Sequence, residues 1–525
     1  MLKRILLIIF TCFAFTACQP EQPETSILVA LVVDGRELTF EYTVPVTVGE
    51  FLRDAEIELG DQDDVNPPVF TQIGDGMRVT VVRVAEQVNC EQNEIPYRRR
   101  TIPNEVLSPG EEQLGQSGQN GVEEVCSRVQ IRDGAAGEAV EISRTIITAP
   151  QEEVVYVGPT GELDPVPVTG TLAYISNRNA WVMRGSSTTK RPLTTTSDLD
   201  ARVFNLSENG QKLLFTRETA ASERDTFFNQ LWLITNTAED REPLQLIPAD
   251  ILYADWVPAQ DNVISYSTGE ARDAAPGWNA LNDLWLMRLD PISGEALDVQ
   301  QLVEPSAGGL YGWWGTQYEW SPNGTMLAWI RADSIGLVNM ETGEFDPLLN
   351  YPVFRTFGDW SWRATLSWSP DNSLIATTVH GAPVGSEPPE TSPAFNIAIT
   401  DTTGSFQADI VDGAGIWAAP QYSPPASATS EFPVGYLAYL RAREPYNSIN
   451  GEYDLVAADR DGSNSRTIFP EEGQPGIQAQ EFVWSPDGQQ IAFIYQGNLW
   501  IIDVGSEVAH QLTLDGGASR PVWTQ

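Results

Sequence analysis

The chain has 525 residues and carries 31 lysine and arginine residues against 72 aspartate and glutamate residues, a formal net charge of −41 at pH 7. This length exceeds what a single hydrophobic core usually organises, so we expect two or three domains. The negative charge repels nucleic acids and anionic lipid headgroups, which argues against polyanions as partners and favours solubility.

The first 25 residues have the layout of a secretory signal followed by a tether. Lys3 and Arg4 give a positive start, and residues 5–15 form an apolar segment too short to span a bilayer. The next four residues, ending in Cys18, resemble the lipobox of bacterial lipoproteins, with Phe15 where leucine is usual. The alternative is an ordinary signal peptide cut beside an unrelated cysteine. The resemblance implies an extracytoplasmic protein attached to the membrane by lipid alone, with a signal peptide over residues 1–17, lipidation of Cys18 and a tether over residues 18–25.

Cysteine usage predicts one disulfide. Cys12 leaves with the signal peptide and Cys18 takes the lipid, so that Cys90 and Cys126 remain. An even remainder in an oxidising compartment favours a bond between them. Two separate buried thiols are the alternative, because the sequence does not fix the distance between two cysteines.

Residues 26–86 are predicted to form a small β-grasp-like domain. Asp34-Gly35 separates two β-rich runs and is a strong hairpin signal. Thr47 and Glu50 have capping-box spacing ahead of helically spaced apolar residues, and a further strand follows. These motifs resemble a small repeat of resuscitation-promoting factors and related wall proteins, in which the repeat precedes a G-five domain.

Residues 87–158 are predicted to be a single-layer β domain with little core. Long strands, polar on both faces, are punctuated by glycines, which supply the positive-φ turns that a thin sheet needs. The segment resembles the G-five domain of cell-wall proteins, which implies either binding of peptidoglycan sugars such as N-acetylglucosamine or a passive spacer. Residues 159–169, with three prolines, are predicted to be a linker. The glycines that carry the resemblance are Gly110, Gly118, Gly121, Gly134 or Gly137, and Gly158.

From residue 170 onward one pattern recurs, in which an aromatic strand meets a Ser-Pro-Asp-Gly turn and alternating strands follow. Such a unit is typical of one four-stranded propeller blade. The clearest copies are marked by Trp320, Trp368 and Trp484, and weaker copies start at Leu206, Trp256 and Tyr422.

The two ends of this region are predicted to share one blade. The region starts at Leu172 without a preceding aromatic motif, and the chain stops at such a strand, residues 520–523. A blade built from both ends closes the ring without a free edge. Six complete copies and one shared copy give seven blades, with six or eight as alternatives. The pattern resembles TolB-like propellers, so we predict a mostly β protein with a propeller over residues 170–525.

No recognised catalytic motif occurs, and we expect no enzyme, metal or cofactor. A Gly-x-Ser-x-Gly elbow, a His-Glu-x-x-His pair and a phosphate loop are missing from the sequence. His380 and His510 are interpreted as surface or strand-end residues. Residues 459–464 faintly resemble a calcium loop but fall at a hairpin turn of the repeat.

Aromatic residues cluster just before the inner strands, where the blades converge on one mouth of the channel. Such residues can stack on sugar rings or anchor a protein loop, and packing between blades is the alternative. We therefore predict a non-catalytic surface protein whose propeller binds a protein or glycan, with the N-terminal domains as an envelope-contacting stalk. A cell-wall or polysaccharide-active enzyme with a carboxylate pair in the propeller is the alternative function. The predicted ligand-binding residues are Tyr311, Trp313, Trp314, Trp360, Trp362 and Trp417.

Overall fold

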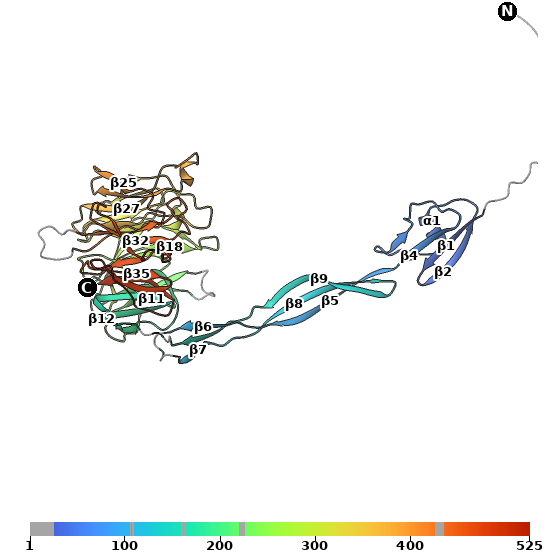
Figure 1. Cartoon of the computed structure of the whole chain (residues 1–525), viewed down its shortest axis with the longest axis horizontal. Coiled ribbons are helices and arrows are strands. Elements are labelled where there is room, and N and C mark those ends of the chain that lie inside the picture. Colours follow the sequence, from blue (N-terminus) through green and yellow to red (C-terminus); the bar gives the residue numbers. More distant parts are fainter. Residues whose placement is uncertain are drawn as a thin grey trace, which may run out of the picture. The chain divides into compact units, whose positions relative to one another are not determined.

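The computed structural model describes residues 26–525 except 105, 106, 108, 109, 159, 160, 162, 220–225 and 426–434. The predicted signal peptide, Cys18 and the tether lie outside the described residues. The chain forms two compact units, residues 26–100 with 114–155 and residues 101–113 with 156–525 (Figure 1). In the part of the chain that is described, no helix is long and apolar enough to cross a bilayer.

The first unit begins with a four-stranded sheet of order β2-β1-β4-β3, and one short helix packs on it. The helix starts at the predicted capping box, because the Thr47 hydroxyl accepts a hydrogen bond from the Glu50 N–H and the Glu50 carboxylate accepts one from the Thr47 N–H. Phe51 and Leu52 are fully buried against the sheet. The elements are β1 (Ile27–Val33), β2 (Arg36–Tyr42), α1 (Val48–Asp54), β3 (Asp64–Asn66) and β4 (Met77–Val82).

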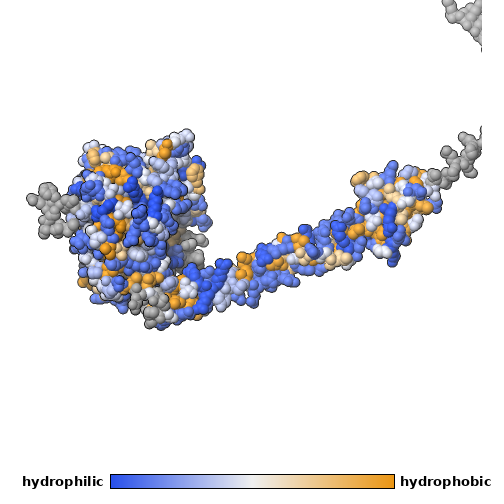
Figure 2. All heavy atoms as spheres, in the orientation of Figure 1, coloured by the Kyte–Doolittle hydropathy of each residue, from blue (hydrophilic) through white to orange (hydrophobic). Residues whose placement is uncertain are grey.

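A three-stranded sheet of order β5-β8-β9 follows in the same unit, built from β5 (Val84–Ile95), β8 (Gly121–Arg132) and β9 (Ala135–Thr148). Every residue of β9 is exposed, and Gly121 is the one buried residue of β8, so the sheet is a single layer. On the face drawn in Figure 2, apolar and polar residues are interspersed along this part of the chain. A second sheet of order β6-β10-β7 comprises β6 (Arg99–Pro103), β7 (Glu112–Gln116) and β10 (Glu153–Val157).

The second unit contains seven further sheets among the described residues. The last strand, β38 (Ala518–Thr524), pairs antiparallel with β11 (Pro167–Ser176), and Leu172 lies opposite Trp523. β11 begins inside the predicted linker, because Val166 and Val168 are buried in a core cluster and order this part of the segment. The first sheet is completed by β12 (Asn179–Pro192).

The other six sheets follow one another along the chain, each with its strands essentially in sequence order. Their strands are β13 (Leu199–Leu206), β14 (Leu213–Glu218), β15 (Asn229–Ile234) and β16 (Leu244–Ala249); β17 (Ile251–Trp256), β18 (Val263–Ala271), β19 (Trp278–Ala280), β20 (Leu284–Leu289) and β21 (Ala296–Val303); β22 (Gln317–Trp320), β23 (Leu327–Ile330), β24 (Ser334–Val338) and β25 (Phe345–Asn350); β26 (Leu366–Trp368), β27 (Leu374–His380), β28 (Phe395–Asp401) and β29 (Gln407–Val411); β30 (Gln421–Tyr422), β31 (Leu437–Ala442), β32 (Tyr453–Ala458) and β33 (Arg466–Phe469); β34 (Phe482–Trp484), β35 (Gln490–Tyr495), β36 (Asn498–Asp503) and β37 (Ala509–Gln511).

Each sheet shares a hydrophobic core cluster with the next, and the last sheet shares one with the first. The cluster between last and first joins Ile501 to Leu172 and Trp181. First strands of neighbouring sheets contact one another, for example β13 with β17 and β26 with β30. We call the first strand of each of these six sheets an inner strand. In the sheet of β11 and β12 the inner strand is β38.

The tryptophan of the repeat has a structural role. The indole of Trp256 donates a hydrogen bond to the Asn205 carbonyl at 3.1 Å, and that of Trp368 donates to the Glu319 carbonyl at 3.2 Å. Trp484 bonds Gln421 in the same way at 3.1 Å. In all three cases the acceptor lies on the inner strand of the preceding sheet. The repeat therefore contains tryptophan at these positions because its ring fills the core between two sheets while its N–H joins them.

Candidate binding face of the second unit

Strand order decides which loops lie together. In each four-stranded sheet the strands run antiparallel in sequence order, so connections into the inner strands share a face with loops between second and third strands. We call this the upstream face; it carries Phe228, Trp278 and Tyr311. The Ser-Pro-Asp-Gly turns lie on the opposite face, which we call the turn face.

Three of the predicted aromatic residues lie together on the upstream face, in and beside the short helix η1 (Gly312–Trp314). The rings of Tyr311 and Trp313 meet edge to face at 5.5 Å, and Trp313 is 46% exposed. Arg363 holds the segment in place, since its Nε donates to the Gly315 carbonyl at 2.8 Å and an Nη donates to the Tyr311 carbonyl at 3.4 Å. This segment can present aromatic surface without first being ordered.

Trp360 and Trp417 form a second pair, with ring centroids 5.7 Å apart. The Trp417 indole donates a hydrogen bond to the Ile449 carbonyl at 2.9 Å. Both rings are half-buried and pack against the core cluster that contains Trp362, and Trp417 also packs against the cluster that contains Tyr453. They combine the two roles that the sequence left open, because each contributes to packing between sheets and keeps some exposed surface.

The prediction of Trp362 as a ligand-binding residue does not fit its position in the core. Trp362 is only 2% exposed and packs on Phe395 at 5.1 Å, while its indole donates to the Ile416 carbonyl. His380 ends β27, which is one of the two expected placements, and it is buried, with its ring nitrogens within 2.9 Å of two backbone carbonyls. Both side chains serve the core between sheets, because their polar atoms have backbone partners there.

Sequence reasoning missed Phe228, Trp278 and Arg202. Trp278 belongs to β19, between the second and third main strands of its sheet, and its ring meets Trp314 edge to face at 5.4 Å. Phe228 lies 6.0 Å from Trp278, and the Arg202 guanidinium carbon lies 4.2 Å above the Trp278 ring. The antiparallel order of the predicted strands could have revealed these loop residues, because it places them on the same face as Trp314.

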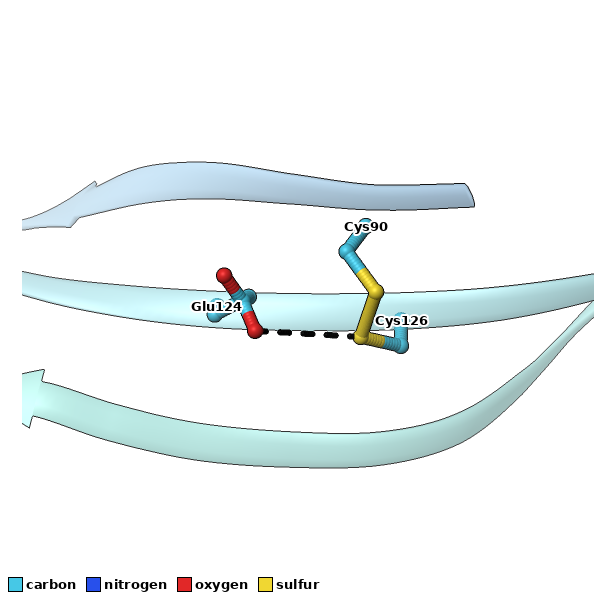
Figure 3. Close-up of a disulfide and its surroundings, with 3 residues drawn as sticks. All are labelled: Cys90, Glu124 and Cys126. Atoms are coloured by element: carbon cyan, nitrogen blue, oxygen red, sulfur yellow. Dashed lines mark hydrogen bonds between the residues drawn. A yellow bond between two sulfur atoms is a disulfide. The ribbon is translucent and has the colours of Figure 1, made fainter. Parts of the chain in front are cut away.

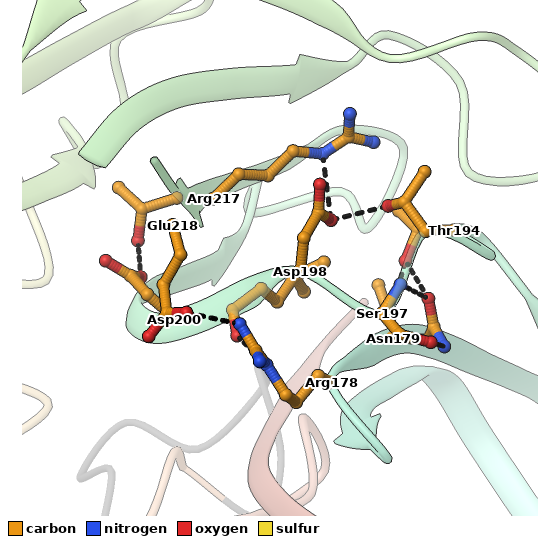
Figure 4. A network of polar contacts seen from close by, with 12 residues as sticks. Arg178, Asn179, Thr194, Ser197, Asp198, Asp200, Arg217 and Glu218 are labelled. Carbon is orange, nitrogen blue, oxygen red and sulfur yellow. Dashed lines mark hydrogen bonds and ion pairs between the residues drawn. The ribbon is translucent and has the colours of Figure 1, made fainter. Parts of the chain in front are cut away.

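A cavity of about 720 Å³ opens beside these side chains, lined by Arg202, Phe228 and Trp278 among others. A polar network stands next to it (Figure 4). Arg178 pairs with Glu218 at 2.6 Å, and Asp200 accepts hydrogen bonds from Thr216 and from Asn229, the latter at 2.9 Å. These contacts fix the loops that border the cavity.

Two carboxylates occupy neighbouring inner strands. Asp255 lines a second cavity, of about 390 Å³, and Glu319 takes the equivalent position on the next sheet. Burial raises the pKa of Asp255 to about 7, against a lowering by the hydrogen bond from the Trp256 N–H. Burial, helped by the charge of Asp255, raises the pKa of Glu319 to about 8. Such a pair can hold a proton at neutral pH.

Comparison with known proteins assigns the thin sheet first. Residues 86–160 match the G5 domain. Residues 29–69 match the G5-linked ubiquitin-like domain, and residues 446–522 match the N-terminal region of dipeptidyl peptidase IV. The first two matches confirm the predicted resemblances to a G-five domain and to the repeat that precedes it. Comparison with curated proteins gave no match.

Solved structures resemble different parts of the chain. A putative TolB from Agrobacterium tumefaciens aligns with 16% identity and a TM-score of 0.34, over 62% of this chain and 96% of that one. A periplasmic gluconolactonase from Pseudomonas aeruginosa aligns with 12% identity and a TM-score of 0.41, over 68% and 99%. HP0197-G5 aligns with 18% identity and a TM-score of 0.14, over 14% and 99%.

In the G5 segment the predicted disulfide is present. Cys90 and Cys126 lie directly opposite each other on β5 and β8, with Cα atoms 4.0 Å apart (Figure 3). Glu124 approaches the Cys126 sulfur at 4.0 Å, which makes this the one group of potential metal ligands among the described residues. Sulfur atoms in a disulfide are not thiolates, so the group does not have the donors of a metal site.

Proposed function

We propose that this chain is a lipid-anchored, extracytoplasmic binding protein. Its second unit is a closed seven-bladed propeller that recognises a protein or a glycan on its upstream face. The observation that carries the proposal is the aromatic surface there. Trp313 is 46% exposed, and the ring of its chain neighbour Trp314 meets Trp278, which in turn meets Phe228. Aromatic clusters of this kind concentrate binding energy in interfaces.

Ring closure is supported by the core clusters. Seven sheets share seven clusters in cyclic order, the last of which joins Ile501 to Leu172. The pairing of β38 with β11 covers what would otherwise be an open sheet edge. A closed ring brings loops from distant parts of the sequence together on one face, which is what a composite binding surface needs.

The β-grasp-like domain and the G5 segment serve as the stalk between the lipid and the propeller. The stalk role rests on the thin sheet of β5, β8 and β9, which is tied by a disulfide and encloses little core. Binding of wall sugars by the same sheet is compatible with the stalk role. The anchor rests on Cys18, and we expect Cys18→Ser to release the full chain from membranes.

The test is binding of envelope material by the full chain. The double variant Trp313→Ala and Trp314→Ala should lose most of the bound material, because it removes the exposed centre of the aromatic surface. Phe406→Ala is the matched control: Phe406 is 47% exposed but lies at the β28–β29 turn, on the turn face. Equal binding by the double variant and the control would refute the proposed face.

A second candidate is hydrolysis of a polysaccharide. It is favoured by Asp255 and Glu319, because glycosidases use a pair of carboxyl groups, one of which has a raised pKa and acts as the acid. Release of reducing sugar from wall polysaccharide by the full chain, abolished by Glu319→Gln, would replace the binding proposal with the enzymatic one. Absence of turnover together with retained binding would favour the binding protein.

A further inference from the structure

The Arg202 guanidinium lies over aromatic rings on the upstream face. Its guanidinium carbon lies 4.2 Å from the centre of the Trp278 ring and 5.4 Å from that of Phe228. A guanidinium stacked in this way can still donate hydrogen bonds from its edge, in a fork that matches a planar carboxylate. The 720 Å³ cavity lies beside the stack and has room for a sugar ring.

The Arg202 side chain makes no ion pair within the described part of the chain, although the charge of nearby Asp200 acts on it. The Nε atoms of Arg202, Arg217 and Arg460 are buried without a hydrogen bond. Arg217 nevertheless pairs with an aspartate at 3.5 Å and Arg460 with another at 2.7 Å, whereas Arg202 makes no ion pair. Lys212 and Arg363 are also largely buried without an ion pair, but their nitrogens donate hydrogen bonds to protein oxygens, which the Arg202 guanidinium does not do among the described residues.

Two acidic side chains that line the same cavity, Asp200 and Glu218, are already engaged. Asp200 accepts hydrogen bonds from Thr216 and Asn229, and Glu218 pairs with Arg178. Burial lowers the pKa of Arg202, and the nearby charge of Asp200 opposes this effect. A carboxylate that arrived from outside would restore the interactions that burial has removed.

We propose that this cavity binds a sugar bearing a single carboxylate, a uronate, with Arg202 as the group that receives the carboxylate. The inference rests on the proposed function, since it names a ligand class for the upstream face. A sugar is favoured over an acidic peptide because Trp278 and Trp314 continue the aromatic surface from the cavity, and exposed Arg272 and Asp273 can bond hydroxyl groups. A single carboxylate is specified because the net charge of −41 repels polyanions.

The test compares two disaccharides that differ in one group, one carrying glucuronate and the other carrying glucose in its place. Titration calorimetry with the full chain should show the uronate bound about tenfold more tightly, as expected for hydrogen bonds to a charged partner. Arg202→Gln should abolish this difference. Arg202→Lys should lose most of it, because lysine keeps the charge but not the planar fork.

Arg241→Gln is the control, because Arg241 is an exposed arginine paired with Glu239 and does not line the cavity. Equal binding of the two disaccharides, or an unchanged preference in Arg202→Gln, overturns the inference. So does equally tight, Arg202-dependent binding of a sugar phosphate or an acidic dipeptide. If Trp313→Ala with Trp314→Ala abolishes binding of envelope material while Arg202→Gln does not, the uronate inference fails and the proposed function stands. If neither variant affects that binding, both fail.

Discussion

At the scale of single residues, the aromatic side chains of the second unit divide by what surrounds them. Trp362 has a backbone acceptor and lies in a closed cluster, whereas Trp313 is nearly half exposed. The sequence places both just before inner strands and cannot separate them, because exposure depends on the loop that follows each. The predicted ligand-binding tryptophans therefore have different roles in the structure.

The two roles predict opposite phenotypes. Trp362→Ala should lower the free energy of unfolding of the second unit by about 3–5 kcal/mol, because it leaves a large cavity and an unpaired carbonyl in the core. Trp313→Ala should change it by about 0.5 kcal/mol or less. Thermal melts of the two variants measure this without any ligand. Similar losses in both would mean that Trp313 is also structural.

The inner-strand carboxylates predict a pH dependence. Asp255 and Glu319 have folded-state pKa values raised to about 7 and about 8, above those of the unfolded chain. Between pH 4 and about 8 the folded state therefore holds more protons, so its stability should fall as the pH rises through this window. Glu319→Gln should flatten the decline and make the variant more stable than the parent at pH 9. A parent and variant with parallel stability curves would contradict the assignment.

At the scale of elements, periodic signals predicted most of the fold. The hairpin at Asp34-Gly35, the helix after Thr47 and the four-stranded sheets marked by Trp320, Trp368 and Trp484 all form where expected. These features depend on turn-forming residues and on the alternation of apolar and polar side chains, and both can be recognised in a single sequence. The cavity beside Arg202 could not be predicted, because it joins a strand to a distant loop whose path depends on tertiary packing.

The thin G5 sheet depends on its disulfide more than a layered domain would. Replacing Cys90 and Cys126 with serine should cost this sheet about 2–4 kcal/mol, because the bond restricts the unfolded chain and little burial is available to compensate. Hydrogen exchange of the β5 and β8 amides should accelerate strongly, while exchange in the second unit stays unchanged. Reductant should reproduce the effect in the parent chain and add nothing in the serine variant. Equal protection of these amides from exchange with and without the disulfide would show that the sheet is stable without it.

At the scale of the whole molecule, the proposed ring depends on a strand contributed by the end of the chain. β38 pairs with β11 and also contacts β13 and β34, so it joins the first sheet to both of its neighbours. Trp523 is 5% exposed within the cluster that includes Leu172 and Ile501. One short strand thus connects residues more than 300 positions apart, and the loops of the upstream face depend on that connection for their spacing.

Deletion of residues 518–525 should therefore affect more than the local sheet. It leaves the edge of β11 unpaired and opens the cluster between the last and first sheets, so we expect a much lower melting temperature and concentration-dependent association through the exposed edge. Removal of Gln525 alone is the matched control, because β38 ends at Thr524 and stays intact. Light scattering and thermal melts at several concentrations measure both effects. A deletion variant that stays monomeric and melts like the control would show that β38 does not close the ring.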